Sequence, residues 1–399
     1  MDRTDVAFLD VTAPGFGFGT PEVAEAQAKN WYADSPVGLL VLRYAEARAL
    51  LRDQRLDHNG KRFMEMNGVS GGPIHDWFVP MIMNHDGEHH RRLRGLVGKA
   101  FTPRMIEGLR PFVRDRAREL AGHLASAAEC DFIEEFANPL PLAVMSEMLG
   151  VPPEDHDVFH TWTTDIGLVF SIALGGDVVT RVETALVGLN KYIDELIEAK
   201  KAEPGDDLVS ALVAAQREDP LISPAELRNL IVTTVFAAHD TTRHQLANAM
   251  VAFAGHPDQW RLLGSRPDLA DRAVDEVMRW LPSSPTIYRF AAQDFDFEGL
   301  HIAEGTFLTM VVTAAQRDPR VFGDGATFDI TASLAAPLLQ FGAGPHHCLG
   351  IALAKAELGE ALPALAARLG APEFAGPFTW RPPIGIHGPN SLPLRFGAR

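Results

Sequence analysis

A single cysteine lies in a glycine-rich loop in the last part of the chain, and its surroundings favour metal binding. Residues 341–350 read FGAGPHHCLG, which places Cys348 among glycines, and the apolar pattern from Ile351 onward predicts a helix. A sulfur at a helix N-terminus faces unpaired N–H groups and the positive end of the helix dipole, which stabilise a thiolate. The glycines allow the backbone to approach a flat ligand closely. On its own, such a cysteine is more often a buried and inert residue.

A carboxylate and a hydroxyl interrupt a long apolar helix in the second half of the chain. An apolar run over residues 230–238 is followed by His239, Asp240 and Thr241, with Arg243 one turn beyond Asp240. Acidic and β-branched side chains are poor choices for the core of a helix, so they indicate a functional role. The alternative is a solvated face, but apolar residues continue at helical spacing after them and leave little room for one.

The helix that carries these residues has a clear start and a clear end. Ser223, Pro224 and Glu226 form a capping box with proline in the first turn. Gly255 and Pro257 stop the pattern at its other end. A helix of this length measures about 45 Å, which is enough to cross a domain.

The composition of the whole chain is that of a globular protein. Of 399 residues, 46% are hydrophobic and 22% are charged. The formal net charge of −16 argues against binding to nucleic acids or to anionic membranes. Two cysteines rule out a disulfide framework, no apolar signal region opens the sequence, and no apolar run reaches the roughly 18 residues of a membrane span. We therefore expect a cytoplasmic protein with no membrane partner.

The remaining patterns predict a mainly α fold with a small β-rich subdomain. Helical patterns cover residues 21–33, 44–53, 88–101, 103–127, 139–149, 153–170, 178–202, 207–218, 258–263 and 267–281. Strand patterns occur at residues 37–42, 286–290, 295–297 and 307–312. Residues 59–83 and 315–340 are expected to be irregular, and the apolar content of the first suggests a lid over an apolar pocket. We expect a single domain over residues 1–399, with β-rich parts near 36–46 and 286–313.

Several of these motifs together resemble the cytochrome P-450 family, the haem-thiolate monooxygenases, over almost the whole chain. The loop at residues 341–350 matches the family pattern Phe-Gly-x-Gly-x-His-x-Cys-x-Gly at every fixed position. Glu276 and Arg279 match its Glu-x-x-Arg pair. Residues 237–242 (AAHDTT) match the oxygen-activation stretch of its long central helix, with Ala238 where glycine is common.

The resemblance implies a cytochrome P-450 fold with the long central helix over a haem b. It makes Cys348 the axial thiolate ligand of the iron, which favours cleavage of the O–O bond. Asp240 and Thr241 become the acid and the alcohol that deliver protons to oxygen. The implied cofactor-binding residues are His90, Arg94, Arg289, Phe341, Gly342, His346, Cys348 and Gly350, while Glu276 and Arg279 are structural.

The implied activity is the insertion of one oxygen atom of O2 into a small or medium hydrophobic substrate. Electrons come ultimately from NAD(P)H through separate partners, a ferredoxin with its reductase or a flavodoxin-type donor, because no flavin, nicotinamide or iron–sulfur motif remains unassigned. The family layout suggests a substrate pocket bordered by Phe78, Phe170, Phe236, Ala238, His239, Pro285 and Ile287. Most of these are apolar, which suits an aromatic or natural-product intermediate of secondary metabolism. His239 and Arg243 leave room for an anionic group, although His239 also fits a core histidine.

Two other interpretations stay open at this point. Seven potential ligands, from His85 to His90 and from His346 to Cys348, are compatible with zinc, but a His-Glu-x-x-His motif and a second nearby cysteine are missing from the sequence. The second alternative keeps the haem and changes the chemistry to coupling, nitration, peroxygenation or isomerisation, or to a non-catalytic haem-binding sensor. The acid–alcohol pair argues against peroxide-driven enzymes and sensors, which need no proton delivery.

Overall fold

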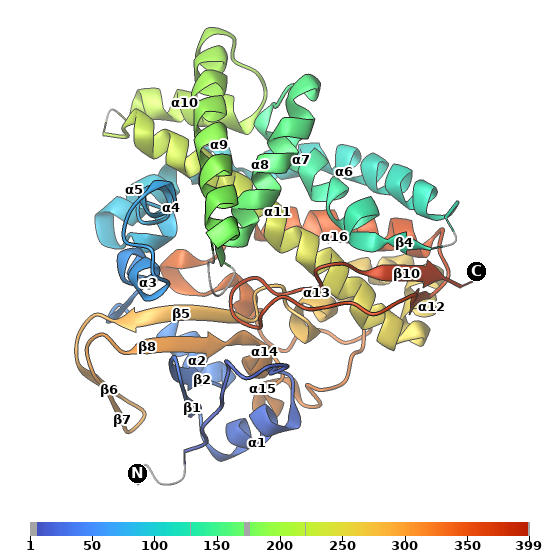
Figure 1. The fold of residues 1–399 in the computed structure, drawn as a ribbon. Coiled ribbons are helices and arrows are strands. Elements are labelled where there is room, and N and C mark those ends of the chain that lie inside the picture. Colours follow the sequence, from blue (N-terminus) through green and yellow to red (C-terminus); the bar gives the residue numbers. More distant parts are fainter. Residues whose placement is uncertain (1–5, 128, 171–175, 220, 398–399) are drawn as a thin grey trace. The chain divides into compact units, whose positions relative to one another are not determined.

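The structure is a computed structural model that describes residues 6–127, 129–170, 176–219 and 221–397 (Figure 1). The chain divides into two compact units that alternate along the sequence. Unit 1 comprises three segments: the N-terminal part up to His58, His244–Cys348, and the C-terminal part from Leu369. Unit 2 comprises Asn59–Arg243 and Leu349–Arg368. Each unit is described by itself below.

A five-stranded sheet organises unit 1, with strand order β1-β2-β8-β5-β3. The strands are β1 (Tyr32–Ser35), β2 (Gly38–Val41), β3 (Leu56–Asp57), β5 (Thr286–Ala291) and β8 (Phe307–Val311). Strands β2 and β8 run parallel, and the other neighbours are antiparallel; Figure 1 shows β5 and β8 side by side. Gly38 is required where β2 meets β8, because a Cβ there would lie 2.3 Å from the carbonyl oxygen of Phe307. Segments far apart in the sequence thus share one sheet.

The rest of unit 1 includes short helices and two small strand pairs. The helices are α1 (Pro21–Lys29), α2 (Tyr44–Leu50), α12 (Pro257–Ser265), α13 (Ala270–Trp280), α14 (Val312–Ala315) and α15 (Pro319–Phe322). The strand pairs are β6 (Phe295–Phe297) with β7 (Leu300–Ile302), and β9 (Pro372–Phe374) with β10 (Pro393–Phe396). One side of the sheet packs Trp31, Tyr44, Leu308 and Met310 into a buried cluster, which holds α2 against the sheet.

Unit 2 is almost entirely helical. Its helices are α3 (Gly60–Met66), α4 (Pro73–Phe78), α5 (Gly87–Ala100), α6 (Pro103–Leu124), α7 (Pro139–Leu149), α8 (His156–Ile166), α9 (Gly176–Ala202), α10 (Leu208–Glu218) and α16 (Ile351–Ala366). A two-residue strand, β4 (Cys130–Asp131), and a π-helical turn, η3 (Ile133–Ala137), join α6 to α7. Helices α6 and α16 pack along each other, and Arg114 on α6 donates to both oxygens of Glu360 on α16 at 2.8 and 3.0 Å.

Helix α11 (Pro224–Gly255) is the long helix that the sequence predicts. Its capping box is confirmed, because Ser223 N–H donates to the Glu226 carboxylate at 2.8 Å and Glu226 N–H donates to the Ser223 hydroxyl at 3.2 Å. The boundary between the two units falls inside this helix, between Arg243 and His244. The mainly α fold with a small β-rich part is confirmed.

The structure corrects several predictions of local structure. Residues 59–83 contain the helices α3 and α4, although the sequence suggested an irregular loop. Helix α4 follows Gly72 and buries Ile74, Trp77 and Phe78, whose spacing is a short helical pattern that glycine and proline obscured. The helix predicted over residues 21–33 ends at Lys29, because the chain then forms strand β1. Residues 315–340, expected to be irregular, contain helix α15. Strands β3, β4, β7, β9 and β10 were not predicted.

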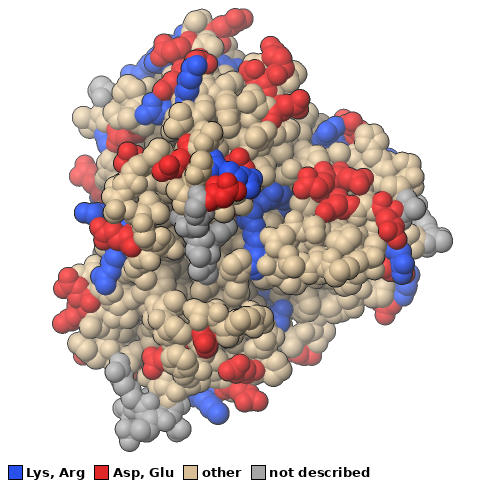
Figure 2. All heavy atoms as spheres, viewed as in Figure 1, with Lys and Arg blue, Asp and Glu red and all other residues tan. Residues whose placement is uncertain are grey.

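Acidic and basic side chains are interspersed on the visible face of the molecule, and acidic ones prevail in the sequence, with 52 Asp and Glu against 36 Lys and Arg (Figure 2). Within the described ranges, no helix combines the length and the apolar character that crossing a membrane requires.

Candidate functional site

The cysteine loop of unit 1 presents its sulfur on the surface of that unit. The turn η7 (Leu339–Phe341) leads into Gly342 at φ 70°, and the turn η8 (Gly344–His346) begins at Gly344 with φ 72°. Residues other than glycine rarely adopt these positive φ angles, so the two glycines determine the path of the loop. The N–H of Cys348 donates to the carbonyl of Phe341 at 2.8 Å, which closes the loop, and the Cys348 side chain is exposed. Gly350 is the N-cap residue of α16. The sulfur is therefore accessible to a ligand, and it precedes the N-cap of α16 by two residues in the sequence.

A buried basic cluster lies in the same unit. Arg289 on β5 is 3% exposed, and its guanidinium donates to the Tyr288 carbonyl at 2.7 Å and to Nε2 of His58 at 2.6 Å. The rings of His58 and His346 lie 4.6 Å apart, edge to face. The structure thus connects Arg289 to His346 through His58, a residue that the sequence analysis missed. His58 reaches this position through the pairing of β3 with β5, which no pattern in the sequence indicated.

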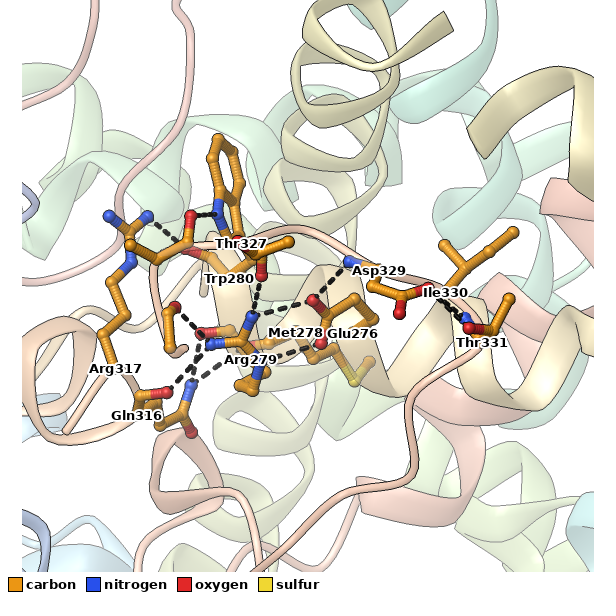
Figure 3. A network of polar contacts seen from close by, with 12 residues as sticks. Glu276, Met278, Arg279, Trp280, Gln316, Arg317, Thr327, Asp329, Ile330 and Thr331 are labelled. Atoms are coloured by element: carbon orange, nitrogen blue, oxygen red, sulfur yellow. Dashed lines mark hydrogen bonds and ion pairs between the residues drawn. The ribbon is translucent and has the colours of Figure 1, made fainter. Parts of the chain in front are cut away.

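A network around Glu276 and Arg279 fixes the segment that leads to the cysteine loop (Figure 3). The two side chains form a bidentate ion pair at 2.7 Å, with 5% and 6% exposure. The Arg279 guanidinium also donates to the carbonyls of Gln316, Gly325 and Thr327. The Glu276 carboxylate accepts the N–H of Asp329 at 2.9 Å. Apart from the short helix α15, the pair therefore organises residues 316–329 through side-chain contacts to the backbone.

One stripe in the middle of α11, within unit 2, is more accessible than the residues around it. Ala237 is exposed, and Thr234, Ala238 and Thr241 are partly exposed, whereas their neighbours in the sequence are mostly buried. The spacing of these residues places them on one helix face. The Thr241 hydroxyl donates to the Ala237 carbonyl at 2.9 Å. A helix that exposes small and hydroxyl side chains on one face offers a surface for a ligand.

The carboxylate of Asp240 lies beside this stripe and is enclosed. The residue is 1% exposed and accepts a hydrogen bond from Arg243 at 2.5 Å, so the two side chains form a buried ion pair. A Cβ on Gly167, at the start of the turn η5 (Gly167–Phe170), would lie 3.0 Å from Cγ of Asp240. The backbone of η5 therefore packs directly against the carboxylate. The acid is held between a cation of its own helix and a neighbouring turn.

His239 has the surroundings of a core histidine. It is fully buried, and its Nε2–H donates to Oδ1 of Asn138 at 2.8 Å. This bond requires a proton on Nε2 and ties α11 to the start of α7. The structure supports the structural role that the sequence left open for this residue.

The other predicted site residues lie in both units. His90 and Arg94 occupy successive turns of α5, where His90 is 3% exposed and Arg94 is half-buried. Phe78 is fully buried, and the Trp77 ring contacts that of Phe236 at 5.8 Å. In unit 1, Pro285 is buried and Ile287 is partly buried. The Phe170 side chain lies outside the described part of the structure. Among the side chains that are described, no three His, Cys, Asp or Glu residues gather as a metal site.

An accessible cysteine loop, buried cationic and imidazole groups and a long helix with an acid and an alcohol are features that suit a haem-thiolate protein. Comparison with known proteins agrees. The family model "Cytochrome P-450" matches residues 265–367. Luteothin monooxygenase of Streptomyces thioluteus is 46% identical over 395 residues, which cover 99% of this chain and 97% of that protein. The chain belongs to the cytochrome P-450 family.

More distant relatives extend the comparison. The mycinamicin IV hydroxylase/epoxidase of Micromonospora griseorubida is 34% identical, covering 89% of this chain and 88% of that protein. The solved structure of cytochrome P-450 CYP109Q5 from Chondromyces apiculatus superimposes with a TM-score of 0.87 at 29% identity, covering 98% of this chain and 99% of that one. The protein is accordingly a monooxygenase that uses haem b and O2, with electrons derived from NAD(P)H through redox partners.

The residues present fit the haem group by their chemistry. The exposed sulfur of Cys348 is a suitable iron ligand, and the buried guanidinium of Arg289 suits a cofactor carboxylate. When bound, a thiolate-ligated haem activates O2 for insertion into a C–H or C=C bond.

Proposed function

We propose that this chain oxidises a hydrophobic natural-product intermediate, with the predicted haem-binding and proton-delivering residues in the roles that their motifs imply. The observation that carries the proposal is the exposed Cys348 sulfur in a closed glycine loop, in a chain 46% identical to luteothin monooxygenase. Cys348 ligates the iron, and Phe341, Gly342 and Gly350 shape its loop. His90, Arg94, Arg289 and His346 hold the cofactor carboxylates, because buried carboxylates require cationic or hydrogen-bonding partners.

Asp240 and Thr241 supply the protons of the reaction in this proposal. The Thr241 hydroxyl lies on the accessible stripe of α11, whereas the Asp240 carboxylate lies behind it under η5. Asp240 takes up protons from solvent when its pair with Arg243 opens, and Thr241 orients the donor beside the reacting oxygen. Phe78, Phe236, Ala238, Pro285 and Ile287 border the substrate, and Phe170 is assigned there from the sequence alone.

The electron donors and the cellular location belong to the same proposal. A ferredoxin with its reductase, or a flavodoxin-type protein, delivers the electrons, since the motifs of this chain account for one haem only. The cytoplasm supplies the NAD(P)H that such a chain of carriers consumes. Reconstitution of turnover with a purified ferredoxin and its reductase tests the donor, and failure with every such pair in the presence of substrate would argue against it.

The assignment of Cys348 is tested with purified protein. The dithionite-reduced carbon monoxide complex should show the red-shifted Soret band of a thiolate-ligated haem, and Cys348→Ser should abolish that band. Cys130→Ser is the matched control, because that cysteine is buried and burial raises the pKa of its thiol to about 12. Retention of the band in Cys348→Ser would overturn the assignment.

The substrate class is tested by titration. Luteothin should shift the Soret band of the ferric protein by displacing the water on iron, and it should be oxidised when electrons are supplied. A Soret shift with luteothin but not with fatty acids supports the natural-product assignment. Oxidation of fatty acids in preference to luteothin would contradict it.

A further inference from the structure

The register of the sheet in unit 1 brings His58 next to Arg289. Strand β3 pairs with β5 in antiparallel fashion, with Leu56 opposite Ala291 and Asp57 opposite Phe290. Continuing this register by one residue places His58 opposite Arg289. Side chains directly opposite each other in an antiparallel pair have Cβ atoms about 4.5–5.5 Å apart. The end of a two-residue strand thus delivers a histidine to a buried arginine.

The contact between the two side chains determines which proton His58 carries. One terminal nitrogen of the Arg289 guanidinium lies 2.6 Å from His58 Nε2. A guanidinium can only donate, so Nε2 accepts and is unprotonated. The ring is therefore neutral in this arrangement, with its proton on Nδ1. The second acceptor of the same guanidinium nitrogen, the Tyr288 carbonyl at 2.7 Å, is neutral as well.

Packing fixes the His58 ring in this orientation. His58 is 4% exposed and Arg289 is 3% exposed. The ring stands edge to face with His346 at 4.6 Å and with Tyr288 at 5.8 Å. Rotation of the imidazole would disturb both ring contacts and the bond to Arg289. His58 therefore holds Arg289 on one side and His346 on the other.

A neutral acceptor at this place has a consequence for ligand binding. These two contacts orient the guanidinium without cancelling its charge, whereas a carboxylate at position 58 would form an ion pair and offset that charge. An arginine that binds an anionic ligand needs a fixed direction and a retained charge. We propose that His58 is a positioning residue for the cofactor carboxylates, acting through Arg289 and His346. This inference rests on the proposed role of those two residues.

The test compares two replacements of His58 that differ in charge. His58→Gln keeps a neutral acceptor near the position of Nε2, and His58→Glu places a carboxylate there. The readout is the rate at which the haem-loaded protein transfers haem to excess apomyoglobin, with the thermal midpoint measured in parallel. We expect His58→Gln to lose haem at nearly the wild-type rate and His58→Glu to lose it about tenfold faster or more. Equal rates for the two variants would overturn the proposal.

Further variants distinguish the role of His58 from the proposed role of Arg289 on which it rests. His58→Phe keeps a ring but removes the acceptor, so it should also release haem faster than the wild type. It tests the proposal if the Glu variant does not fold. His256→Phe is the control, because His256 bonds the Ala252 carbonyl at 2.8 Å and packs among rings of the same unit; its haem loss should be unchanged. If Arg289→Leu retains haem like the wild type, the carboxylate role of Arg289 fails. If Arg289→Leu releases haem and His58→Phe does not, only the role of His58 fails.

Discussion

Asp240 and Arg243 form a buried ion pair on one helix, and neither residue is more than 6% exposed. The attraction of a nearby cation favours the charged carboxylate, and the turn at Gly167 limits access from the other side. An acid in this position exchanges protons only when its partner or its cover moves. Arg243 is therefore expected to influence how protons reach the reacting oxygen.

Removal of Arg243 should uncouple electron consumption from product formation. Arg243→Ala leaves a buried carboxylate without its cation, and we expect the product formed per NAD(P)H to fall about tenfold, because positioned proton donors contribute about 10²–10⁴-fold to rate. Arg243→Lys should restore part of the coupling. The measurement is the ratio of product to NAD(P)H consumed, with hydrogen peroxide as the side product.

The matched control for this prediction lies on the same helix. Arg228 on α11 pairs with Asp194 at 2.6 Å, but its side chain is 35% exposed and that of Asp194 is 51% exposed. Arg228→Ala should leave the coupling ratio unchanged. Similar coupling in Arg243→Ala and Arg228→Ala would show that the buried pair has no part in proton delivery.

At the level of elements, the segment over residues 316–329 contains few regular hydrogen bonds, and the Glu276–Arg279 pair on α13 takes their place. A guanidinium carries five N–H donors in a planar fork, so it can donate to several carbonyls at once. The compact ammonium group of a lysine lacks this fixed geometry. Arg279 uses this geometry to bind three carbonyls and one carboxylate. The helix therefore determines the path of a coil more than 35 residues further along the chain.

Breaking this pair should destabilise the protein strongly. Arg279→Ala leaves the Glu276 carboxylate buried and unpaired, at a cost of about 3–5 kcal/mol in the free energy of unfolding. Arg266→Ala, which removes an exposed pair with Asp268, should cost less than about 1 kcal/mol. Urea unfolding of both variants measures the difference. A loss below about 1 kcal/mol for Arg279→Ala would contradict the role assigned to the network.

At the scale of the whole molecule, one buried carboxyl group makes stability depend on pH. Glu357 on α16 is 1% exposed, its Oε2 has no hydrogen-bond partner among the described residues, and burial raises its pKa from 4.5 to about 8. The native state keeps this proton to a higher pH than the unfolded state does. Stability therefore falls as pH rises from about 4.5 to 8, where the native carboxyl group ionises.

Neutralising this group should stabilise the protein at alkaline pH. Glu357→Gln is expected to raise the thermal midpoint at pH 8.5 but to change it little at pH 5, because each pKa unit corresponds to about 1.4 kcal/mol. Scanning fluorimetry at both values checks this. Glu195→Gln, at a side chain that is 65% exposed, is the control and should have no pH-dependent effect. If Glu357→Gln stabilises the protein equally at both pH values, or destabilises it equally, the prediction is contradicted.

Local features whose residues are close together in the chain could be predicted from the sequence alone. The capping box of α11, the glycines of the cysteine loop and the i,i+3 spacing of Glu276 and Arg279 are short-range patterns, and backbone geometry links such patterns directly to structure. For the same reason the resemblance of these motifs was sufficient to predict the fold class and the class of activity.

Contacts between distant residues became evident only from the tertiary structure. Arg289 and His58 are 231 positions apart, and their contact depends on the register of β3 against β5. The union of β1 and β2 with β8 likewise depends on strand pairing, and the environment of His239 depends on Asn138. Strand register and side-chain packing are set by the combined burial of many residues, so no short-range spacing in the sequence predicts them. His58 was therefore invisible in the sequence, although its partner Arg289 was recognised there.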